Sequence, residues 1–261
     1  MNKILAIAFN TYKEAIRNKV FYIILLFAIG LLLFSFALAT LSLGNEDRII
    51  KDIGLSAINI FGLLIATFVG VNLVYDELER RTIYTIIASG VTRTEFILGK
   101  FLGLFITIVV NVAMMGFLLC LLISFWPGIN VTASLILAMY LFLFEMMVII
   151  AVAVLFSSFS TPVLSAILTF MCWVIGHMSE DLWEWSRHVI EDGSVAFGYF
   201  LRFLYFILPN LEIYNIKNQV VHQEDLGFIP YLIFLYPLAA IVYSGILMWI
   251  TNYSFAKRDF K

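Results

Sequence analysis

One ionisable side chain, Glu145, lies deep inside a long apolar run of this sequence. A carboxylate at the centre of a lipid bilayer costs several kcal/mol unless it is paired or hydrated. We therefore expect Glu145 to face a cavity or the interior of a helix bundle, where it either lines a pathway or forms a structural hydrogen bond. Three amide side chains in other apolar runs are weaker pathway candidates, and hydrogen bonding between helices is the role we favour for each: Asn59, Asn72 and Asn111.

A second group of side chains has the types that bind soft metals, since Met171, Cys172, His177 and Met178 fall within eight residues. On a helix, however, adjacent residues such as Met171 and Cys172 point about 100° apart, and methionine is also an ordinary filler of apolar packing. We therefore expect no metal site. Both cysteines, Cys120 and Cys172, lie in apolar runs and are expected to pack as small hydrophobic side chains.

The arrangements that would make this chain an enzyme are missing from the sequence. An intramembrane metalloprotease needs clustered histidines and a glutamate, as in H-E-x-x-H. The 3 histidines, His177, His188 and His222, lie in or beside one segment, and none is near Glu145 in the sequence. The chain also lacks the G-x-x-x-x-G-K-S/T loop that binds nucleotide phosphates. We predict no catalytic residues, and a membrane-embedded protease, a channel or a structural scaffold stays open as an alternative.

The composition indicates which solvent surrounds most of the chain. Of the 261 residues, 62% are hydrophobic and only 13% are charged, and the mean hydropathy is +1.00. A soluble domain carries about 25% charged residues, and a fold of this size in water could not bury so much apolar surface. The formal net charge of −2 lacks the basic excess of a nucleic-acid-binding protein. We therefore predict an all-α integral membrane protein, with a single domain over residues 1–261 and membrane lipid around it.

Apolar runs of about 20 residues are long enough to cross the hydrocarbon of a bilayer. The sequence has six such runs, and we predict a transmembrane helix in each: 20–43, 53–75, 101–126, 129–156, 161–178 and 226–256. Thr161 followed by Pro162 is typical of a helix start, with threonine as the N-cap and proline as the first helical residue. In the last run, Pro230 is expected to open the helix and Pro237 to kink it.

The basic residues predict the direction of insertion. Eleven of the 16 Lys and Arg residues lie before the first run, between the second and third, or after the sixth, which places both termini in the cytoplasm. The other five lie on the opposite side. A cleavable signal peptide ending at Ala37-x-Ala39 is disfavoured, because 19 residues precede the first run and that run is a full span.

Two segments on the cytoplasmic side have helical patterns of their own. Residues 3–19 predict an amphipathic helix in the plane of the membrane interface, either as a topology anchor or as a lever on the first span. Residues 76–100 predict a helix, a turn at Gly90 and a second helix that continues into the third span. Asp76 and Thr92 are the expected N-caps, each with a glutamate three residues later.

The segment 179–225 on the outer side is the longest connection between predicted spans. Ser179 is expected to cap a helix whose first turn carries two acidic residues. Residues 194–208 are apolar and aromatic nearly all round but too few to span, so they predict a re-entrant or interfacial helix.

Several stretches resemble the membrane subunit of an ABC exporter of the second type, the group that contains the permeases of nitrous-oxide-reductase maturation and sodium-efflux systems. The most specific is ELERRTIYTIIA at 77–88 with TRTEFILGK at 92–100. Weaker similarity follows in SSFSTP at 157–162 and LPNL at 208–211. With six spans and inside termini, the resemblance covers essentially the whole chain.

The resemblance implies a permease of the bacterial inner membrane that pairs with a second permease subunit, as a homodimer, and with two copies of an ATPase. It implies that segment 76–100 is the coupling elbow that docks on the ATPase, and that outer re-entrant helices cap the pathway. The charged residues implied in docking are Asp76, Glu77, Glu79, Arg80, Arg81, Arg93 and Glu95. ATP and Mg²⁺ would bind to the ATPase, so no cofactor is expected on this chain, and the sequence does not indicate the substrate.

Overall fold

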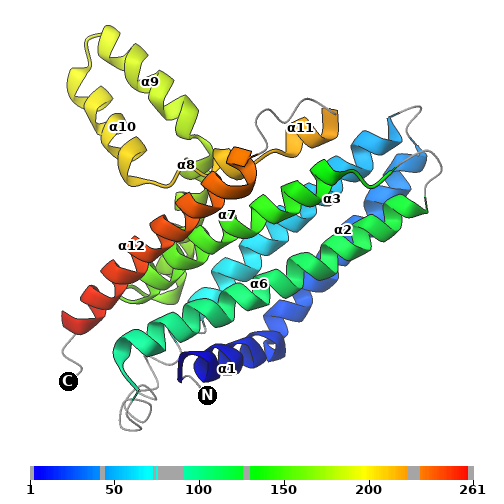
Figure 1. Ribbon diagram of the computed structural model, residues 1–261. Coiled ribbons are helices and arrows are strands. Elements are labelled where there is room, and N and C mark those ends of the chain that lie inside the picture. The colour runs from blue at the N-terminus through cyan, green and yellow to red at the C-terminus, as the bar shows by residue number, and fades with distance from the viewer. Residues whose placement is uncertain are drawn as a thin grey trace.

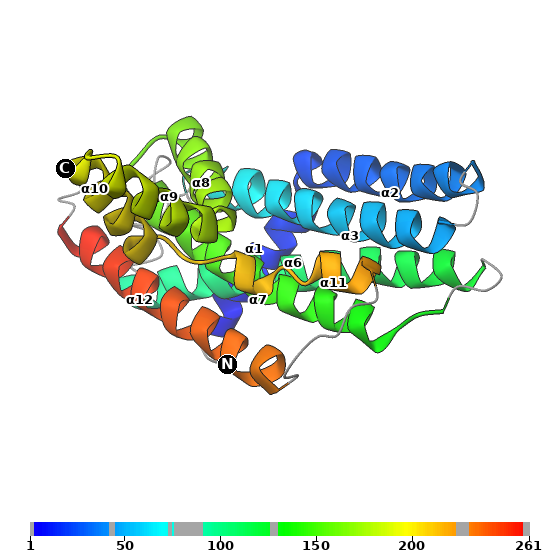
Figure 2. The same ribbon diagram turned by 90° about the horizontal axis from the view of Figure 1, so that it is seen from above.

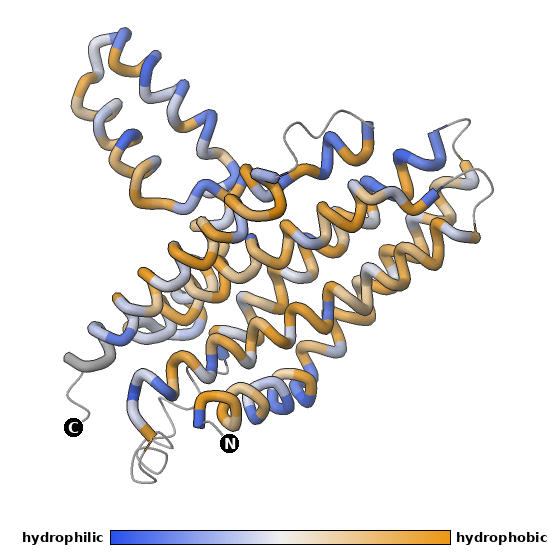
Figure 3. The backbone as a smooth tube through the Cα atoms, in the orientation of Figure 1, coloured by the Kyte–Doolittle hydropathy of each residue, from blue (hydrophilic) through white to orange (hydrophobic). Residues whose placement is uncertain are grey.

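The computed structural model of this chain describes residues 3–41, 45–72, 75, 91–125, 130–222 and 230–257, and these described residues contain helices but no strand. Figure 1 shows an elongated helix bundle with a helical hairpin that projects from one end. Apolar residues dominate the helices of the bundle, whereas polar residues gather toward its two ends and along part of the hairpin (Figure 3). This distribution fits a bundle whose middle is surrounded by lipid.

Five helical stretches are long and apolar enough to cross a membrane. They are α2 (Lys19–Thr40), α3 (Glu46–Leu64) with its π-helical continuation η1 (Ile65–Val69), α6 (Arg93–Ser124), α7 (Ala133–Ser157), and η3 (Tyr231–Leu235) with α12 (Tyr236–Lys257). Each coincides with one of the predicted spans. The chain is therefore a multi-pass membrane protein, as the composition predicts.

The remaining predicted span, residues 161–178, is shorter than the others. The helix α8 (Pro162–His177) has 16 residues, and at about 1.5 Å per residue it is about 24 Å long, against about 30 Å of hydrocarbon. A bend of 72° then leads into α9 (Ser179–Glu191), so the number of spans is five, or six if this bent pair counts as one. The predicted start is confirmed, with Thr161 as N-cap and Pro162 as the first helical residue.

The central helix of the bundle is α7, which packs against α3, α6, α8 and α12. Every residue from Val148 to Val154 is buried. A helix that is apolar all round belongs in the interior of a bundle. By contrast, α2 and α12 expose large apolar side chains on their outer faces, such as Leu26 and Trp249, as expected for contact with lipid. Figure 2 shows α2 and α3 side by side along one flank of the bundle.

Pro237 is accommodated by a π-helical start rather than by regular α-helix. The five-residue η3 begins directly after Pro230 and ends two residues before Pro237. Proline has no N–H, so the carbonyl of Ile233, four residues earlier, loses its helical donor. The hydroxyl of Tyr140 on α7 donates to that carbonyl at 3.1 Å. A side chain from the central helix therefore donates to the carbonyl that Pro237 cannot serve.

The N-terminal helix α1 (Lys3–Arg17) crosses α6 at very short distance. A Cβ atom at Gly99 would lie 2.6 Å from Ile7, and one at Gly103 would lie 2.5 Å from the carbonyl oxygen of Ala8. Only glycine permits this approach. The ammonium of Lys100 lies 3.2 Å from Glu14, and the lysine side chain is only 2% exposed. A helix therefore forms in this segment, and it packs mainly on the third predicted span and less on the first.

The outer segment forms a helical hairpin of α9 and α10 (Val195–Ile207), which projects from the bundle in Figure 1. Arg202 on α10 lies over the ring of Trp183 on α9, 5.2 Å from its centroid. The prediction that Ser179 caps α9 is wrong. Its hydroxyl donates backward to the carbonyl of Gly176 at 2.6 Å, and Met178 occupies the N-cap position. The hairpin is followed by η2 (Glu212–Tyr214) and α11 (Lys217–His222).

Candidate functional site

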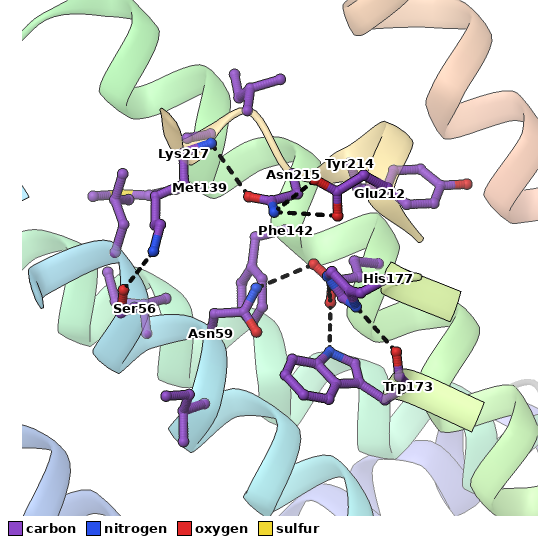
Figure 4. A pocket seen from close by; sticks show the side chains of 16 residues that line it. Ser56, Asn59, Met139, Phe142, Trp173, His177, Glu212, Tyr214, Asn215 and Lys217 are labelled. Carbon is purple, nitrogen blue, oxygen red and sulfur yellow. Dashed lines mark hydrogen bonds and ion pairs between the residues drawn. The ribbon is translucent and has the colours of Figure 1, made fainter. Parts of the chain in front are cut away.

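The buried carboxylate of Glu145 lies at the middle of α7 and is 1% exposed. The indole N–H of Trp173 on α8 donates to Oε1 at 2.9 Å, and the amide of Asn59 on α3 donates to Oε2 at 3.2 Å. His177, one turn after Trp173, places Nε2 at 3.5 Å from Oε1. Figure 4 shows Asn59, Trp173 and His177 converging from two helices. Glu145 therefore faces other side chains of the bundle, not lipid.

The geometry around His177 determines which ring nitrogen carries a proton. Nδ1 lies 3.1 Å from the carbonyl oxygen of Trp173, which can only accept, so Nδ1 is the donor. Nε2 is therefore the ring nitrogen that faces the Glu145 carboxylate, at 3.5 Å from Oε1.

A cavity of about 350 Å³ opens beside this network. Its walls come from α3, α7, α8 and the segment 212–217, which runs through η2 to the start of α11. At its rim, the ammonium of Lys217 lies 3.0 Å from Asp52 and 3.0 Å from the hydroxyl of Ser56. The Asp52 side chain is 51% exposed, so the rim is in contact with the surroundings. The cavity thus connects the network at mid-helix with the end of the bundle that carries η2.

Hydrogen bonds from two of its side chains hold the segment 212–217 in place. The hydroxyl of Tyr214 donates to the carbonyl of Tyr236 at 3.3 Å, which links η2 to the start of α12. Burial raises the pKa of the Tyr214 phenol, so this group stays a hydrogen-bond donor at neutral pH. The amide of Asn215 donates to both carboxylate oxygens of Glu212, at 3.2 and 3.4 Å. The cavity wall that this segment provides is therefore a defined structure.

Of the pathway candidates predicted from sequence, the structure brings only Glu145 and Asn59 together. Asn72 lines a second cavity of about 880 Å³, which is almost entirely apolar and lies between α3, η1 and α8. Asn111 is fully buried in α6, and neither of its amide atoms has a hydrogen-bond partner among the described residues. The hydrogen bond between helices that was expected of Asn111 is therefore not found in this part of the chain.

Most of the predicted docking elbow, including Asp76, Glu77, Glu79, Arg80 and Arg81, lies outside the described residues. The other two docking residues, Arg93 and Glu95, are in the first turn of α6. The predicted capping box is confirmed there. Thr92 accepts from the backbone N–H of Glu95 at 3.2 Å, and the Glu95 carboxylate accepts from the Thr92 N–H at 2.7 Å.

Sequence reasoning missed four residues of the site: Trp173, His177, Glu212 and Lys217. Trp173 and His177 are four residues apart, a spacing that places both on one face of a helix. That spacing is visible in the sequence, but it does not show that Glu145 lies opposite this face. Although no histidine is near Glu145 in the sequence, His177 contacts it in the fold. In the described part of the chain, no three or more His, Cys, Asp or Glu side chains are grouped to hold a metal.

Comparison with known families identifies one match. A family model described as "ABC-2 family transporter protein" matches residues 5–178. The matched stretch begins in α1 and ends just after α8, so it includes Asn59, Glu145, Trp173 and His177 but not the segment 212–217. Among curated proteins, none matches the chain at a significant level.

Proposed function

We propose that this chain, which belongs to the ABC-2 family of transporter proteins and is a membrane-embedded permease subunit, works as an exporter together with a separate ABC ATPase. The family match together with the five or six candidate spans is the observation that carries this proposal. In the proposed assembly, two copies of the chain form the pathway and two ATPase subunits bind ATP and Mg²⁺. We also propose that the chain is similar to the permeases of nitrous-oxide-reductase maturation and sodium-efflux systems.

The proposed orientation places both termini in the cytoplasm of a bacterial cell. The start of α1, the start of α6 and the end of α12 lie at one end of the bundle, and the hairpin α9–α10 lies at the other (Figure 1). Most Lys and Arg residues belong to segments at the first end, which the positive-inside rule assigns to the cytoplasm. In this orientation the Glu145 cavity opens toward the outside.

The proposed coupling between ATPase and permease runs through the elbow 76–100 into α6. Since α6 starts at Arg93, within the elbow, displacement of the elbow would move α6 directly. The glycine-mediated crossing at Gly99 and Gly103 fastens α1 to the first turns of α6. We propose that α1 and α6 move as one unit when ATP binding closes the ATPase, and that the bundle thereby alternates between two arrangements.

Charge reversal in the elbow tests the docking proposal. We expect reversal of Glu77, Glu79 and Arg80 together to weaken co-purification with the ATPase and to reduce coupled ATP hydrolysis, because clustered charges steer and hold such contacts. The matched control reverses Glu180, Glu184 and Arg187, three exposed residues of α9 at the other end of the molecule. Full co-purification and coupled hydrolysis in the elbow variant would refute docking at this segment.

Cysteine labelling tests the proposed topology. In a background without Cys120 and Cys172, single cysteines at Ser194 and Asn210 bracket α10, which has 13 residues. At about 1.5 Å per residue, such a helix is too short to cross about 30 Å of hydrocarbon. We expect an impermeant thiol reagent to label both sites from outside intact cells. Labelling of the two sites from opposite sides would add a span and contradict the proposed orientation.

A further inference from the structure

The side chains that line the cavity beside Glu145 favour one class of ligand. We infer that it binds a compact molecule carrying a protonated amine, whose N–H groups donate to the Glu145 carboxylate and to Asn59. This inference deepens the proposed function, because the cavity would then be where the permease meets its cargo or an outside ligand. Binding can be measured on the chain alone, without transport.

The charges that line the cavity favour a cation. Two carboxylates line it, those of Glu145 and Glu212. The hydrogen-bond donors to these carboxylates are the neutral indole of Trp173 and the neutral amides of Asn59 and Asn215, and the imidazole of His177 lies 3.5 Å from Glu145. Lys217 also lines the cavity, but the nearby carboxylate of Asp52 offsets its charge at 3.0 Å. A positively charged ligand would therefore gain electrostatic energy on entering, most of all against a carboxylate that is 1% exposed.

Among the described residues that line the cavity, the buried polar atom without a hydrogen-bond partner is an acceptor. Oδ1 of Asn59 is buried, and no donor from the described part of the chain reaches it. The amide cannot be reversed without cost, because its N–H group donates to Glu145. An ionised carboxylate has about four acceptor sites, and Trp173 and Asn59 occupy one on each oxygen of Glu145. An ammonium group has three donors and no acceptor, so it complements this set.

The walls of the cavity favour an organic ammonium over a metal cation. The ring of Phe142, the indole of Trp173 and apolar side chains such as Leu55 and Met139 share the lining with the polar groups. Aromatic faces attract cations that have shed their water, at distances up to about 6 Å. A calcium ion would instead require about six to eight oxygen ligands. The volume of about 350 Å³ lies at the small end of ligand sites, about 300–1,000 Å³, so the ligand is compact.

The test is isothermal titration of the purified chain with three probes that differ in charge and in N–H donors. They are n-butylammonium chloride, n-butanol and butyltrimethylammonium chloride, each at the same ionic strength. We expect n-butylammonium to bind at least tenfold more tightly than n-butanol, which lacks the charge, and more tightly than butyltrimethylammonium, which lacks the N–H donors. Equal binding of n-butylammonium and either other probe overturns the inference, and this comparison requires no variant.

Variants locate the binding within the molecule. Glu145→Gln keeps the shape of the side chain and should lower the affinity for n-butylammonium at least tenfold. Asn59→Leu removes the buried acceptor and should lower the affinity for n-butylammonium severalfold. The control is Glu191→Gln on α9, a side chain that is 70% exposed and lies outside the cavity lining, and it should bind like the wild type. Wild-type affinity in Glu145→Gln overturns the assignment. If the wild-type chain does not bind n-butylammonium although its ATPase coupling is intact, this inference alone is refuted and the proposed function still stands.

Discussion

Two almost fully buried ionisable side chains, Glu145 in α7 and Lys100 in α6, lie in opposite kinds of surroundings. Glu145 accepts hydrogen bonds from Trp173 and Asn59 and lies beside a cavity, where Oδ1 of Asn59 has no donor among the described residues. Lys100 pairs with the carboxylate of Glu14 where Gly99 and Gly103 let two helices approach closely. A charge in tight packing fixes the relative position of its helices, whereas a charge beside a cavity can exchange partners. The α1–α6 contact is therefore suited to transmit movement, and the Glu145 site to bind and release.

Among the substitutions that test this comparison, we expect those at Glu145 to change the free energy of unfolding most. Glu145→Leu leaves the donors of Trp173 and Asn59 unpaired, at a cost of about 1–3 kcal/mol for each in the free energy of unfolding. Glu145→Gln keeps an acceptor oxygen, so it should unfold within about 1 kcal/mol of the wild type. Thermal unfolding of the purified chain measures the stability of both variants.

The same two variants separate a role in transport from a purely structural role. If Glu145 serves binding and release, Glu145→Gln should lose most substrate-stimulated ATPase activity although its stability is preserved. Normal activity in Glu145→Gln, with a destabilised Glu145→Leu, would make Glu145 a structural link like the α1–α6 contact. Wild-type behaviour of both variants would contradict either role.

A methyl group at Gly103 should cause the next largest effect. The new Cβ would lie 2.5 Å from the carbonyl oxygen of Ala8. Because backbone cannot move as easily as a side chain, we expect Gly103→Ala to lose about 1–3 kcal/mol of stability. Gly245→Ala in α12 is the matched control, since nothing lies within 4 Å of its Cβ. That control should gain up to about 1 kcal/mol from helix propensity. Equal melting temperatures for the two variants would show that the α1–α6 contact is loose.

The ion pair at the α1–α6 contact should give the smallest effect. Glu14 is 41% exposed, so solvent screens its attraction to Lys100, and we expect Glu14→Gln to cost about 1 kcal/mol or less. A double-mutant cycle with Lys100→Met measures the coupling between the two side chains. A coupling well above about 1 kcal/mol would show that charge pairing, and not glycine packing, fixes this contact.

Features that depend on neighbouring residues could be predicted from the sequence. Five of the six apolar runs coincide with long helices, and the Thr92–Glu95 box and the Thr161–Pro162 pair predict two helix starts. The failure at Ser179 has the same local origin, because a serine hydroxyl can bond either forward to an N–H or backward to a carbonyl. The outcome there depends on the 72° bend that precedes α9, which no local pattern indicates.

The Glu145 site depends on contacts between residues that are far apart in the sequence. Burial of Glu145 follows from its position in an apolar run. Its partners come from separate helices, with Asn59 86 residues away and Trp173 28 residues away. The polar wall at 212–217 comes from a segment whose sequence indicates only an outer connection. Periodicity indicates which face of a helix is polar, but not which other helix lies opposite that face.

The shortness of α8 has an electrical consequence. Trp173 and His177, which contact Glu145, lie in the last turns of α8, so the polar cavity begins close to where that helix ends. In a membrane the voltage falls across the low-dielectric part of the structure, and a charge crossing all of it exchanges about 2.3 kcal/mol per 100 mV. In the proposed orientation, a water-filled cavity that reaches halfway along α7 would carry the outside potential inward and concentrate the field between Glu145 and the α1 end. A cation arriving from outside would cross only part of the membrane voltage before it reaches Glu145. It would cross the rest of the voltage when it is released on the other side.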